Sequence, residues 1–495
     1  MKELKYLNKY LKKYRFRLIL GVIITVVARI FSLFAPRLIG NSLTAVERYL
    51  QNDTYTLEVI KQELFWNIII IISAALVSGF LTFLMRQTII NVSRYIEYDL
   101  KNEIFKQYQK LCLSFYKNNR TGDLMNRISE DVSKVRMYFG PAIMYSINTF
   151  SLFIIVISYM VSIAPILTIY TLLPLPVLSI IIYKLSKAIN IKSTAVQETL
   201  SDLSTFTQES FSGVAIIKSY GIQSKIEKDF KKLTLISKEK NVSLARVQAW
   251  FFPLMVLLIG FSNLLVILVG GKQYIDGIIE IGVLAEFIIY VNMLTWPVAT
   301  VGWVTSIVQQ AEASQKRINA FLNEVPSIIN GTLDKQIEEG VLEFKNVSFT
   351  YKETQIKAID NISFKLNPGK TLGIIGKTGS GKSTILNLIN RLYDVDEGEI
   401  LIDDIPIKNY MLSRIRSEIG YVPQNPFLFS ETIESNIHFG KQDANLEEIK
   451  SAAKSAEVSN DIERFKNGYQ TLLGERGVTL SGGQIQRISI ARALI

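Results

Sequence analysis

The stretch GKTGSGKST, residues 376–384, decides the fold of the C-terminal third of this chain. It follows the apolar run TLGIIG (371–376) and leads into the apolar run ILNLI (385–389), so we predict a buried strand, a glycine loop and a helix. Gly379 and Gly381 allow backbone conformations that other residues rarely adopt. Consecutive N–H groups of such a loop, at the positive end of a helix, bind phosphate. The stretch therefore predicts a nucleotide site.

Two side chains of this loop have separate expected roles. Lys382 adds a positive charge toward the β- and γ-phosphates, and the Ser383 hydroxyl is placed to ligate Mg²⁺. The expected cofactors are therefore ATP and Mg²⁺, whereas a glycine turn without a ligand is the alternative that the strand–loop–helix context disfavours. The predicted phosphate loop comprises Gly376, Lys377, Thr378, Gly379, Ser380, Gly381, Lys382, Ser383 and Thr384.

Composition indicates that much of the remaining chain lies in a membrane. Hydrophobic residues make up 48% of the 495 residues, and the formal net charge is +11. The basic residues concentrate beside long apolar runs and not among aromatic residues on one patch, which favours anionic lipid over nucleic acid as the acidic partner. The single Cys112 excludes an internal disulfide and is expected to be a buried small residue. Six runs are long enough to span a bilayer, near residues 16–39, 64–85, 139–161, 163–183, 251–271 and 278–300.

The distribution of Lys and Arg predicts the orientation of these spans. Basic residues concentrate before the first run and in segments 86–138 and 184–249, whereas 41–63 is acidic and 272–277 is nearly neutral. Both termini are therefore expected in the cytoplasm, in an integral protein of a bacterial plasma membrane. No small-residue cleavage site follows the first run, so we interpret it as a retained anchor.

The two long basic segments are expected to be helical extensions of the membrane helices. Each runs for more than 50 residues with few prolines or glycines, and structureless connections of that length are uncommon in compact proteins. Breaks at NNRTGD (118–123) and SGVAIIKSYG (212–221) mark the predicted turning points farthest from the membrane.

A second glycine turn, LSGGQ at 480–484, opens the last predicted helix and is called the signature turn below. With the six spans and the phosphate loop, it makes the chain resemble ATP-binding cassette (ABC) exporters of the half-transporter type. FYKNNRTGDLMNRISEDV (115–132) and QESFSGVAIIKSYG (208–221) resemble the two cytoplasmic coupling regions of that family. The resemblance covers essentially the whole chain and implies a multi-domain membrane protein. It implies an all-α six-helix transmembrane domain at 1–325, a linker at 326–340 and an α/β P-loop nucleotide-binding domain, incomplete, at 341–495.

The resemblance also implies roles for residues outside the phosphate loop. Tyr351 matches the aromatic residue that stacks on adenine, with a strand-end core tyrosine as the alternative. Gln424 matches the glutamine that touches Mg²⁺ and the attacking water, with a solvated loop residue as the alternative. Glu475 matches a loop that senses the coupling helices. Lys382 and Gln424 are thus the candidate catalytic residues, Ser383 and Gln424 the metal ligands, and Ser481, Gly482, Gly483 and Gln484 the turn that closes over the γ-phosphate held by a partner subunit.

The chain stops at Ile495, before the family's buried strand ending in Asp-Glu and before its switch histidine. We therefore expect a truncated gene product more than a natural short form, with background ATPase activity and a soluble part whose apolar residues are exposed. His438 precedes the signature turn and is expected to be structural or on the surface. Asp403 and Asp404 follow an apolar run but come too early in the chain to be the family's magnesium site.

The leading functional hypothesis is an ATP-driven exporter or lipid flippase that acts as a homodimer or heterodimer of half-transporters. A non-hydrolysing, ATP-gated regulator or channel-like subunit is the alternative, and an inactive fragment that pairs with an intact copy is a third. Polar residues within membrane spans are functional candidates because burying them in lipid is costly. Structural ion pairs or interfacial positions are the alternative for these five: Arg29, Asn148, Asn263, Glu286 and Asn292.

Overall fold

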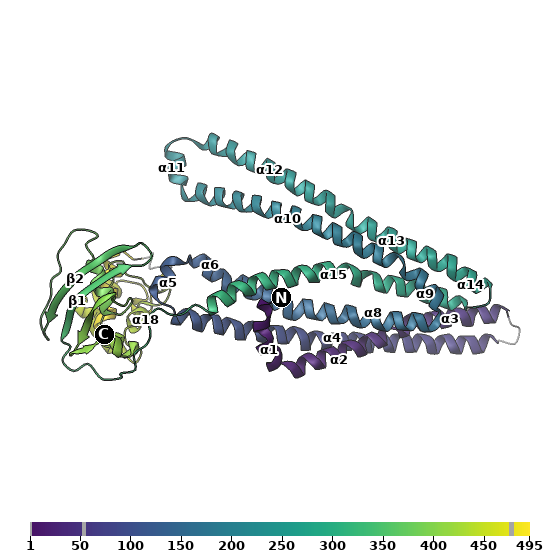
Figure 1. Ribbon diagram of the computed structural model, residues 1–495, viewed down its shortest axis with the longest axis horizontal. Coiled ribbons are helices and arrows are strands. Elements are labelled where there is room, and N and C mark those ends of the chain that lie inside the picture. Colours follow the sequence, from purple (N-terminus) through teal and green to yellow (C-terminus); the bar gives the residue numbers. More distant parts are fainter. Residues whose placement is uncertain (1, 52–55, 475–479) are drawn as a thin grey trace. The chain divides into compact units, whose positions relative to one another are not determined.

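The computed structural model describes residues 2–51, 56–474 and 480–495 (Figure 1). The chain divides into two units by its internal contacts. The membrane unit comprises Met1–Gln107 and Leu124–Asn323. The nucleotide unit comprises Tyr108–Asp123 and Glu324–Ile495, so a short segment between two membrane helices packs with the C-terminal part of the chain.

All regular elements among the described residues of the membrane unit are helices, and the six predicted spans are confirmed. Six helical segments of the described chain are long and apolar enough to cross a membrane: Arg15–Gln51, Leu57–Lys110, Thr121–Ile163, Pro165–Ser212, Gln223–Ile275 and Ile281–Leu322. Before the first lie η1 (Glu3–Leu7) and α1 (Asn8–Lys13). The segments consist of α2 (Arg15–Ser32), α3 (Phe34–Gln51), α4 (Leu57–Lys110), α6 (Thr121–Asn126), η2 (Arg127–Asp131), α7 (Val132–Met137), η3 (Tyr138–Ala142), α8 (Ile143–Ile163), α9 (Pro165–Leu172), α10 (Pro174–Ser212), α12 (Gln223–Ala249), α13 (Phe251–Leu265), η4 (Val266–Gly270), α14 (Gly271–Ile275) and α15 (Ile281–Leu322).

The helices extend far beyond a bilayer, as the sequence predicts. The 54 residues of α4 span about 80 Å, against a hydrocarbon core of about 30 Å. Figure 1 shows α10 and α12 as an antiparallel pair joined by the short α11 (Val214–Ser219). The other predicted break also forms, because α5 (Leu113–Asn118) ends before α6 begins. The connection between the third and fourth spans is very short, because only Ala164 lies between α8 and α9.

One close helix contact in the membrane unit depends on glycine. A Cβ on Gly282 of α15 would lie 2.1 Å from the carbonyl oxygen of Gly40 in α3, so a larger residue would force the helices apart. The Gly282 N–H donates to Thr44 Oγ1 at 3.2 Å, and Arg48 forms an ion pair with Glu280 at 2.7 Å. These contacts fix the first span against the sixth.

The nucleotide unit contains a four-stranded antiparallel sheet of order β2-β1-β3-β4. Its strands are β1 (Leu342–Tyr351), β2 (Ile356–Leu366), β3 (Glu397–Ile402) and β4 (Ile405–Pro406). β1 covers nearly all of the alternating run VLEFKNVSFTY (341–351). Phe344 of β1 pairs with Phe364 of β2, and their stacked rings lie 4.5 Å apart.

The two aspartates after β3 make a turn. Asp403 and Asp404 have positive φ angles of 49° and 59°, which form the two-residue connection from β3 to β4. The Asp403 carboxylate accepts hydrogen bonds from the N–H groups of Glu338 at 2.9 Å and Val341 at 2.8 Å. Asp403 therefore fixes the end of the linker to the sheet.

The strand predicted at 371–376 does not form, and that prediction is wrong. These residues belong to no strand or helix, and Leu372, Ile374 and Ile375 are exposed, Ile375 by 99%. A strand needs a neighbour to satisfy its N–H and C=O groups, and no strand in the described part of the chain pairs with this segment. The helix predicted after the glycine loop nevertheless forms as α16 (Lys382–Ile389).

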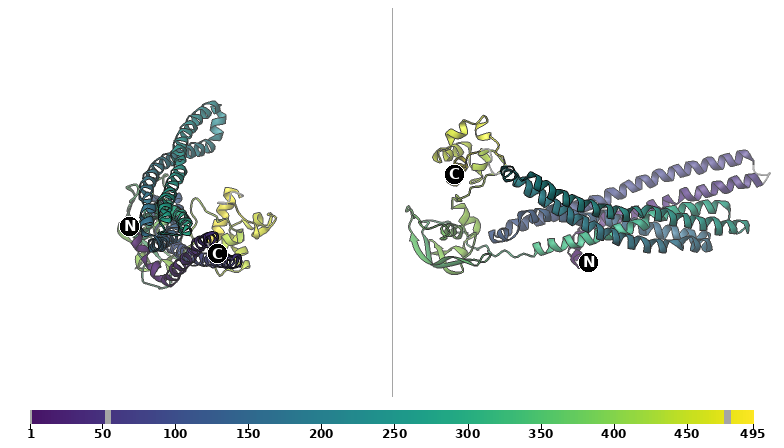
Figure 2. Two further views of the ribbon diagram at one scale, coloured as in Figure 1. Left: turned by 90° about the vertical axis from the view of Figure 1, so that its right-hand side faces the viewer. Right: turned by 90° about the horizontal axis from the view of Figure 1, so that it is seen from above.

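The described residues of the nucleotide unit form two hydrophobic cores. One surrounds the sheet and includes Phe344, Phe349 and Tyr410, all buried. The other lies among the C-terminal helices, drawn in yellow in Figure 2, where Ile437, Ala453 and Ile488 are fully buried. The remaining helices of this unit are η5 (Ile407–Asn409), α17 (Leu412–Ser417), α18 (Ile433–His438), α19 (Leu446–Ser455), α20 (Ser459–Glu463), η6 (Gly468–Gln470) and α21 (Gly482–Leu494). His438 is half-buried at the end of α18, which agrees with a structural role.

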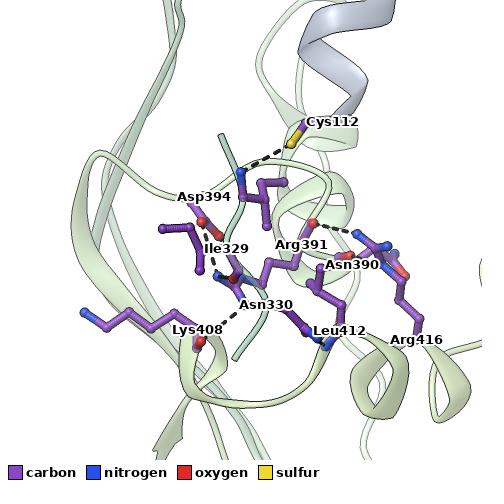
Figure 3. A network of polar contacts seen from close by, with 10 residues as sticks. Cys112, Ile329, Asn330, Asn390, Arg391, Asp394, Lys408, Leu412 and Arg416 are labelled. Carbon is purple, nitrogen blue, oxygen red and sulfur yellow. Dashed lines mark hydrogen bonds and ion pairs between the residues drawn. The ribbon is translucent and has the colours of Figure 1, made fainter. Parts of the chain in front are cut away.

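The predicted linker is bound firmly to the nucleotide unit through Arg391 (Figure 3). Arg391 is 3% exposed, pairs with Asp394 at 2.8 Å, and donates to the carbonyl oxygens of Ile329 at 2.9 Å and Lys408 at 3.2 Å. The half-buried Cys112 takes part nearby, because its Sγ accepts a hydrogen bond from Ile328 N at 3.2 Å. Residues 328–329 are thus held from two sides.

Replacing Arg391 by methionine should destabilise the nucleotide unit by about 2–4 kcal/mol, because two carbonyls and a carboxylate lose a buried charged donor. The matched control is Arg414→Met. Arg414 pairs with Asp334 at 3.0 Å, but the Asp334 side chain is 61% exposed, so the expected loss is about 1 kcal/mol or less. Thermal unfolding in detergent measures both variants. Equal losses of stability in the two variants would show that the buried Arg391 contacts contribute no more than an exposed ion pair.

Candidate nucleotide-binding and translocation sites

The phosphate loop has the backbone that its glycines predict. Gly379 and Gly381 both adopt left-handed conformations, with φ of 85° and 86°. Gly381 is also the N-cap residue of α16, and a Cβ there would lie 2.2 Å from the carbonyl oxygen of Ala358. Alanine at Gly381 would therefore be excluded by its backbone angle and by its neighbour.

The Lys382 ammonium lies inside the loop. Its Nζ donates to the carbonyl oxygens of Gly376 at 2.8 Å and Lys377 at 2.7 Å. A positive charge is thereby held beside the first turn of α16, where N–H groups without an intrahelical partner also favour an anion. This arrangement can bind a phosphate chain if the ammonium exchanges the two carbonyls for phosphate oxygens.

Tyr351 lies beside the phosphate loop. Its hydroxyl is 3.0 Å from Thr384 Oγ1, and its ring is perpendicular to those of Phe349 at 4.9 Å and Tyr393 at 5.2 Å. The predicted adenine residue and the last residue of the predicted loop therefore meet in the structure. The Lys117 ammonium lies over the same ring, 4.8 Å from its centroid.

The two predicted metal ligands, Ser383 and Gln424, have no described contact with each other. Ser383 is exposed at the start of α16, and Gln424 is exposed in the connection between α17 and α18. No hydrogen bond described for the chain joins Gln424 to the phosphate loop, and no group of three His, Cys, Asp or Glu side chains among the described residues is suited to a metal. Of the two predicted ligands, only the Ser383 hydroxyl lies in the phosphate loop.

The signature turn forms a capped helix start. Ser481 is the N-cap residue of α21: its hydroxyl accepts from Gln484 N at 3.3 Å, and Gln484 Oε1 accepts from Ser481 N at 3.0 Å. This capping box fixes the turn. Gly482 is exposed, and a Cβ there would meet no atom within 4 Å, so the turn is open to a ligand. Glu475 lies outside the described residues.

The polar residues predicted in the membrane spans differ in their surroundings. Glu286 is buried and accepts a hydrogen bond from Tyr290 of its own helix at 2.9 Å, whereas Asn292 donates to the Ile288 carbonyl at 2.8 Å. These two have partners within α15. Arg29 Nε and the Oδ1 atoms of Asn148 and Asn263 are buried without a hydrogen-bond partner in the described chain.

A cavity of about 650 Å³ in the membrane unit involves none of these five residues. Its wall combines aromatic and polar side chains from α8, α10, α13 and α15 with one cation, Lys187. The sequence does not reveal this cavity, because α10 and α15, which contribute most of its lining, lie far apart in the chain. The only signal was the amphipathic run KLSKAIN (184–190) after the fourth span. The lining includes Phe153, Tyr183, Ser186, Lys187, Asn190, Trp303 and Gln309.

Comparison with known proteins agrees with this architecture. Residues 18–298 match the ABC transporter transmembrane region, and residues 359–495 match the ABC transporter family model. The chain is 35% identical over 490 residues to the multidrug resistance-like ATP-binding protein MdlA of Escherichia coli, covering 99% of this chain and 82% of that protein. It is 33% identical over 494 residues to the probable multidrug resistance ABC transporter ATP-binding/permease protein YheI of Bacillus subtilis, with 99% and 83% covered.

A further relative has a different described activity. The ATP-dependent lipid A-core flippase 1 of Colwellia psychrerythraea is 30% identical over 443 residues, which cover 87% of this chain and 73% of that protein. Two family models and several relatives above 30% identity thus match both units of the chain. This protein belongs to the ABC transporter family, as an exporter of the half-transporter type with its membrane domain fused to its ATP-binding domain.

Proposed function

We propose that this protein couples ATP binding at two composite sites to alternating access of its membrane domain, and so exports an amphipathic, anionic substrate. The observation that carries the proposal is the Lys382 ammonium held in a left-handed glycine loop, in the same chain as six membrane spans. Residues 1–325 would form the transport domain and 341–495 the ATP-binding domain, joined by the linker 326–340. A second half-transporter, identical or different, would complete the pair.

The chain's own residues would hold ATP from both ends. Tyr351 would stack on adenine, and the loop from Gly376 to Thr384 would bind the phosphates, with Lys382 exchanging its carbonyl partners for β- and γ-phosphate oxygens. Ser383 and Gln424 would ligate Mg²⁺, which neutralises phosphate charge when it is bound. The open turn at Ser481 would face the γ-phosphate held by the other subunit. Two ATP molecules between two chains would then draw the nucleotide units together.

The cavity in the membrane unit supports the proposed substrate class. Ligand sites are concave and mostly apolar, with a few polar groups that fix orientation. Here Phe153, Tyr183 and Trp303 offer apolar surface, and Lys187 offers a positive charge. This combination suits an amphiphile with an anionic head, a class of molecule that includes anionic lipids. The described names of the relatives, multidrug resistance proteins and a lipid A-core flippase, are consistent with amphipathic cargo.

In the full-length gene product, Lys187→Ala should reduce stimulation of ATPase activity by dodecyl phosphate about tenfold, because a charged hydrogen bond contributes about 1.5–3 kcal/mol. Stimulation by dodecylamine and basal activity should stay unchanged. Lys184→Ala removes the same charge three residues away, outside the cavity lining, and should have little effect.

Arg29→Ala tests Arg29, the other residue that could bind the anionic group of the substrate. If Arg29→Ala abolishes stimulation while Lys187→Ala does not, the substrate site lies at Arg29 and not in the cavity. If all three variants are stimulated by dodecyl phosphate and by dodecylamine as the wild type is, neither Lys187 nor Arg29 recognises an anionic substrate.

A further inference from the structure

A short helix from the membrane domain's sequence packs within the nucleotide unit (Figure 1). This helix, α5, lies in the segment Tyr108–Asp123, which interrupts the membrane unit but packs with the C-terminal part of the chain. Leu113 packs against the hydrophobic core around the sheet, and the neighbouring Cys112 accepts from Ile328 N. The segment is therefore fixed on the nucleotide unit next to the sheet that carries Tyr351.

Lys117, near the end of α5, lies in a corner formed by two tyrosine rings. Its Nζ is 4.8 Å from the centroid of Tyr351 and 5.2 Å from that of Tyr393. The two rings are perpendicular, with centroids 5.2 Å apart. An ammonium over an aromatic face at such a distance makes a favourable cation–π contact. Partial burial lowers the pKa of Lys117, but the neighbouring Tyr393, Tyr351 and Glu353 raise it, so that its net value exceeds the usual one and the group is charged at neutral pH.

Among the side chains that contact the Tyr351 ring, Lys117 is the one that can move away from it. Phe349 precedes Tyr351 by two residues on β1, and Tyr393 is 7% exposed in the core, so both rings are fixed. The Lys117 side chain is exposed, and its ammonium sits at the end of a long aliphatic stem with several rotatable bonds. A nucleobase that stacks on Tyr351 needs a ring face, and the ammonium lies over that ring.

We infer that Lys117 competes with the nucleobase for the ring of Tyr351, so that ATP binding removes one attachment of the Tyr108–Asp123 segment to the nucleotide unit. The inference rests on the proposed role of Tyr351 as the adenine-stacking residue. Lys117 is on this account a positioning residue: it sets the affinity for the base and links base occupancy to the segment that connects two membrane helices.

This competition predicts that removing Lys117 changes the affinity for ATP in the direction opposite to the one expected from charge alone. Removing a lysine near a nucleotide ordinarily weakens binding, because ATP is an anion. Loss of a competing cation–π contact instead strengthens it. Lys117→Met should therefore tighten ATP binding to the chain about twofold to fivefold, the equivalent of one exposed cation–π contact.

Isothermal titration with ATP and with inorganic tripolyphosphate, which lacks a base, tests this inference. Lys117→Met should tighten ATP binding but leave tripolyphosphate binding unchanged, whereas Lys117→Arg, which keeps a cation over the ring, should bind ATP as the wild type does. Lys110→Ala removes a charge from the same segment and serves as the matched control. Unchanged or weaker ATP binding in Lys117→Met, or an equal tightening toward tripolyphosphate, would overturn the inference.

A Tyr351→Leu variant separates this inference from the proposed site. If it weakens ATP but not tripolyphosphate binding, the adenine role of Tyr351 stands and the Lys117 result is decisive on its own. If it leaves ATP affinity unchanged, adenine does not stack on Tyr351 and the site proposal fails together with the competition.

Discussion

Lys382→Ala is expected to lower the affinity of the chain for MgATP by about a hundredfold or more. The Lys382 ammonium is the positive charge inside the phosphate loop, where it is held by the Gly376 and Lys377 carbonyls. Each charge-assisted hydrogen bond to phosphate contributes about 1.5–3 kcal/mol, so losing two of them amounts to about 3 kcal/mol or more. Photolabelling with an azido-ATP analogue, displaced by unlabelled ATP, measures the change.

Two further variants show whether charge or loop structure is responsible. Lys382→Gln keeps an N–H donor for the loop carbonyls but removes the charge, and it should bind ATP as weakly as Lys382→Ala. Lys370→Ala removes an exposed lysine before the loop and should bind normally. Wild-type affinity in both Lys382 variants would remove the nucleotide site from this loop.

Ser481→Arg is expected to abolish ATP-dependent association of the nucleotide units while one chain still binds ATP. The turn at Ser481 is open in the single chain, and the proposed role of this turn is to contact the γ-phosphate of the other subunit. A large side chain at this position would separate the two surfaces. Cross-linking between introduced cysteines on two chains, with and without ATP, measures closure.

The capping role of Ser481 needs its own control, because losing an N-cap costs about 1 kcal/mol. Ser481→Asp keeps a capping acceptor but places a negative charge toward the phosphate, so it should block closure with the helix intact. Ser451→Arg adds the same arginine at an exposed position of α19 and should close normally. If cross-linking persists undiminished in both Ser481 variants, the turn does not serve the partner subunit.

The sequence predicts the membrane architecture because its signals are local. Twenty apolar residues in a row satisfy their own backbone hydrogen bonds as a helix, so length and composition suffice to locate α4 or α13. The glycine loop is equally local: Gly379 and Gly381 carry their left-handed geometry wherever the turn forms. The capping box at Ser481 and Gln484 is also contained within four residues.

Features that depend on distant partners could not be predicted. The run at 371–376 has the composition of a buried strand, yet it remains unpaired because no described strand lies beside it. Glu286 looks like a substrate contact in the sequence, but Tyr290, one helical turn away, satisfies it. The cavity at Lys187 and the contact of Lys117 with Tyr351 both join residues more than 100 positions apart.

Transport in inside-out membrane vesicles tests the central claim most directly. Vesicles that contain the full-length gene product should accumulate a fluorescent alkyl phosphate when ATP is added. Vesicles with Lys382→Ala should show no accumulation above that of vesicles without the protein, and those with Lys370→Ala should match the wild type. Accumulation that is independent of ATP, or that persists undiminished in Lys382→Ala, would contradict an ATP-driven exporter powered through this phosphate loop.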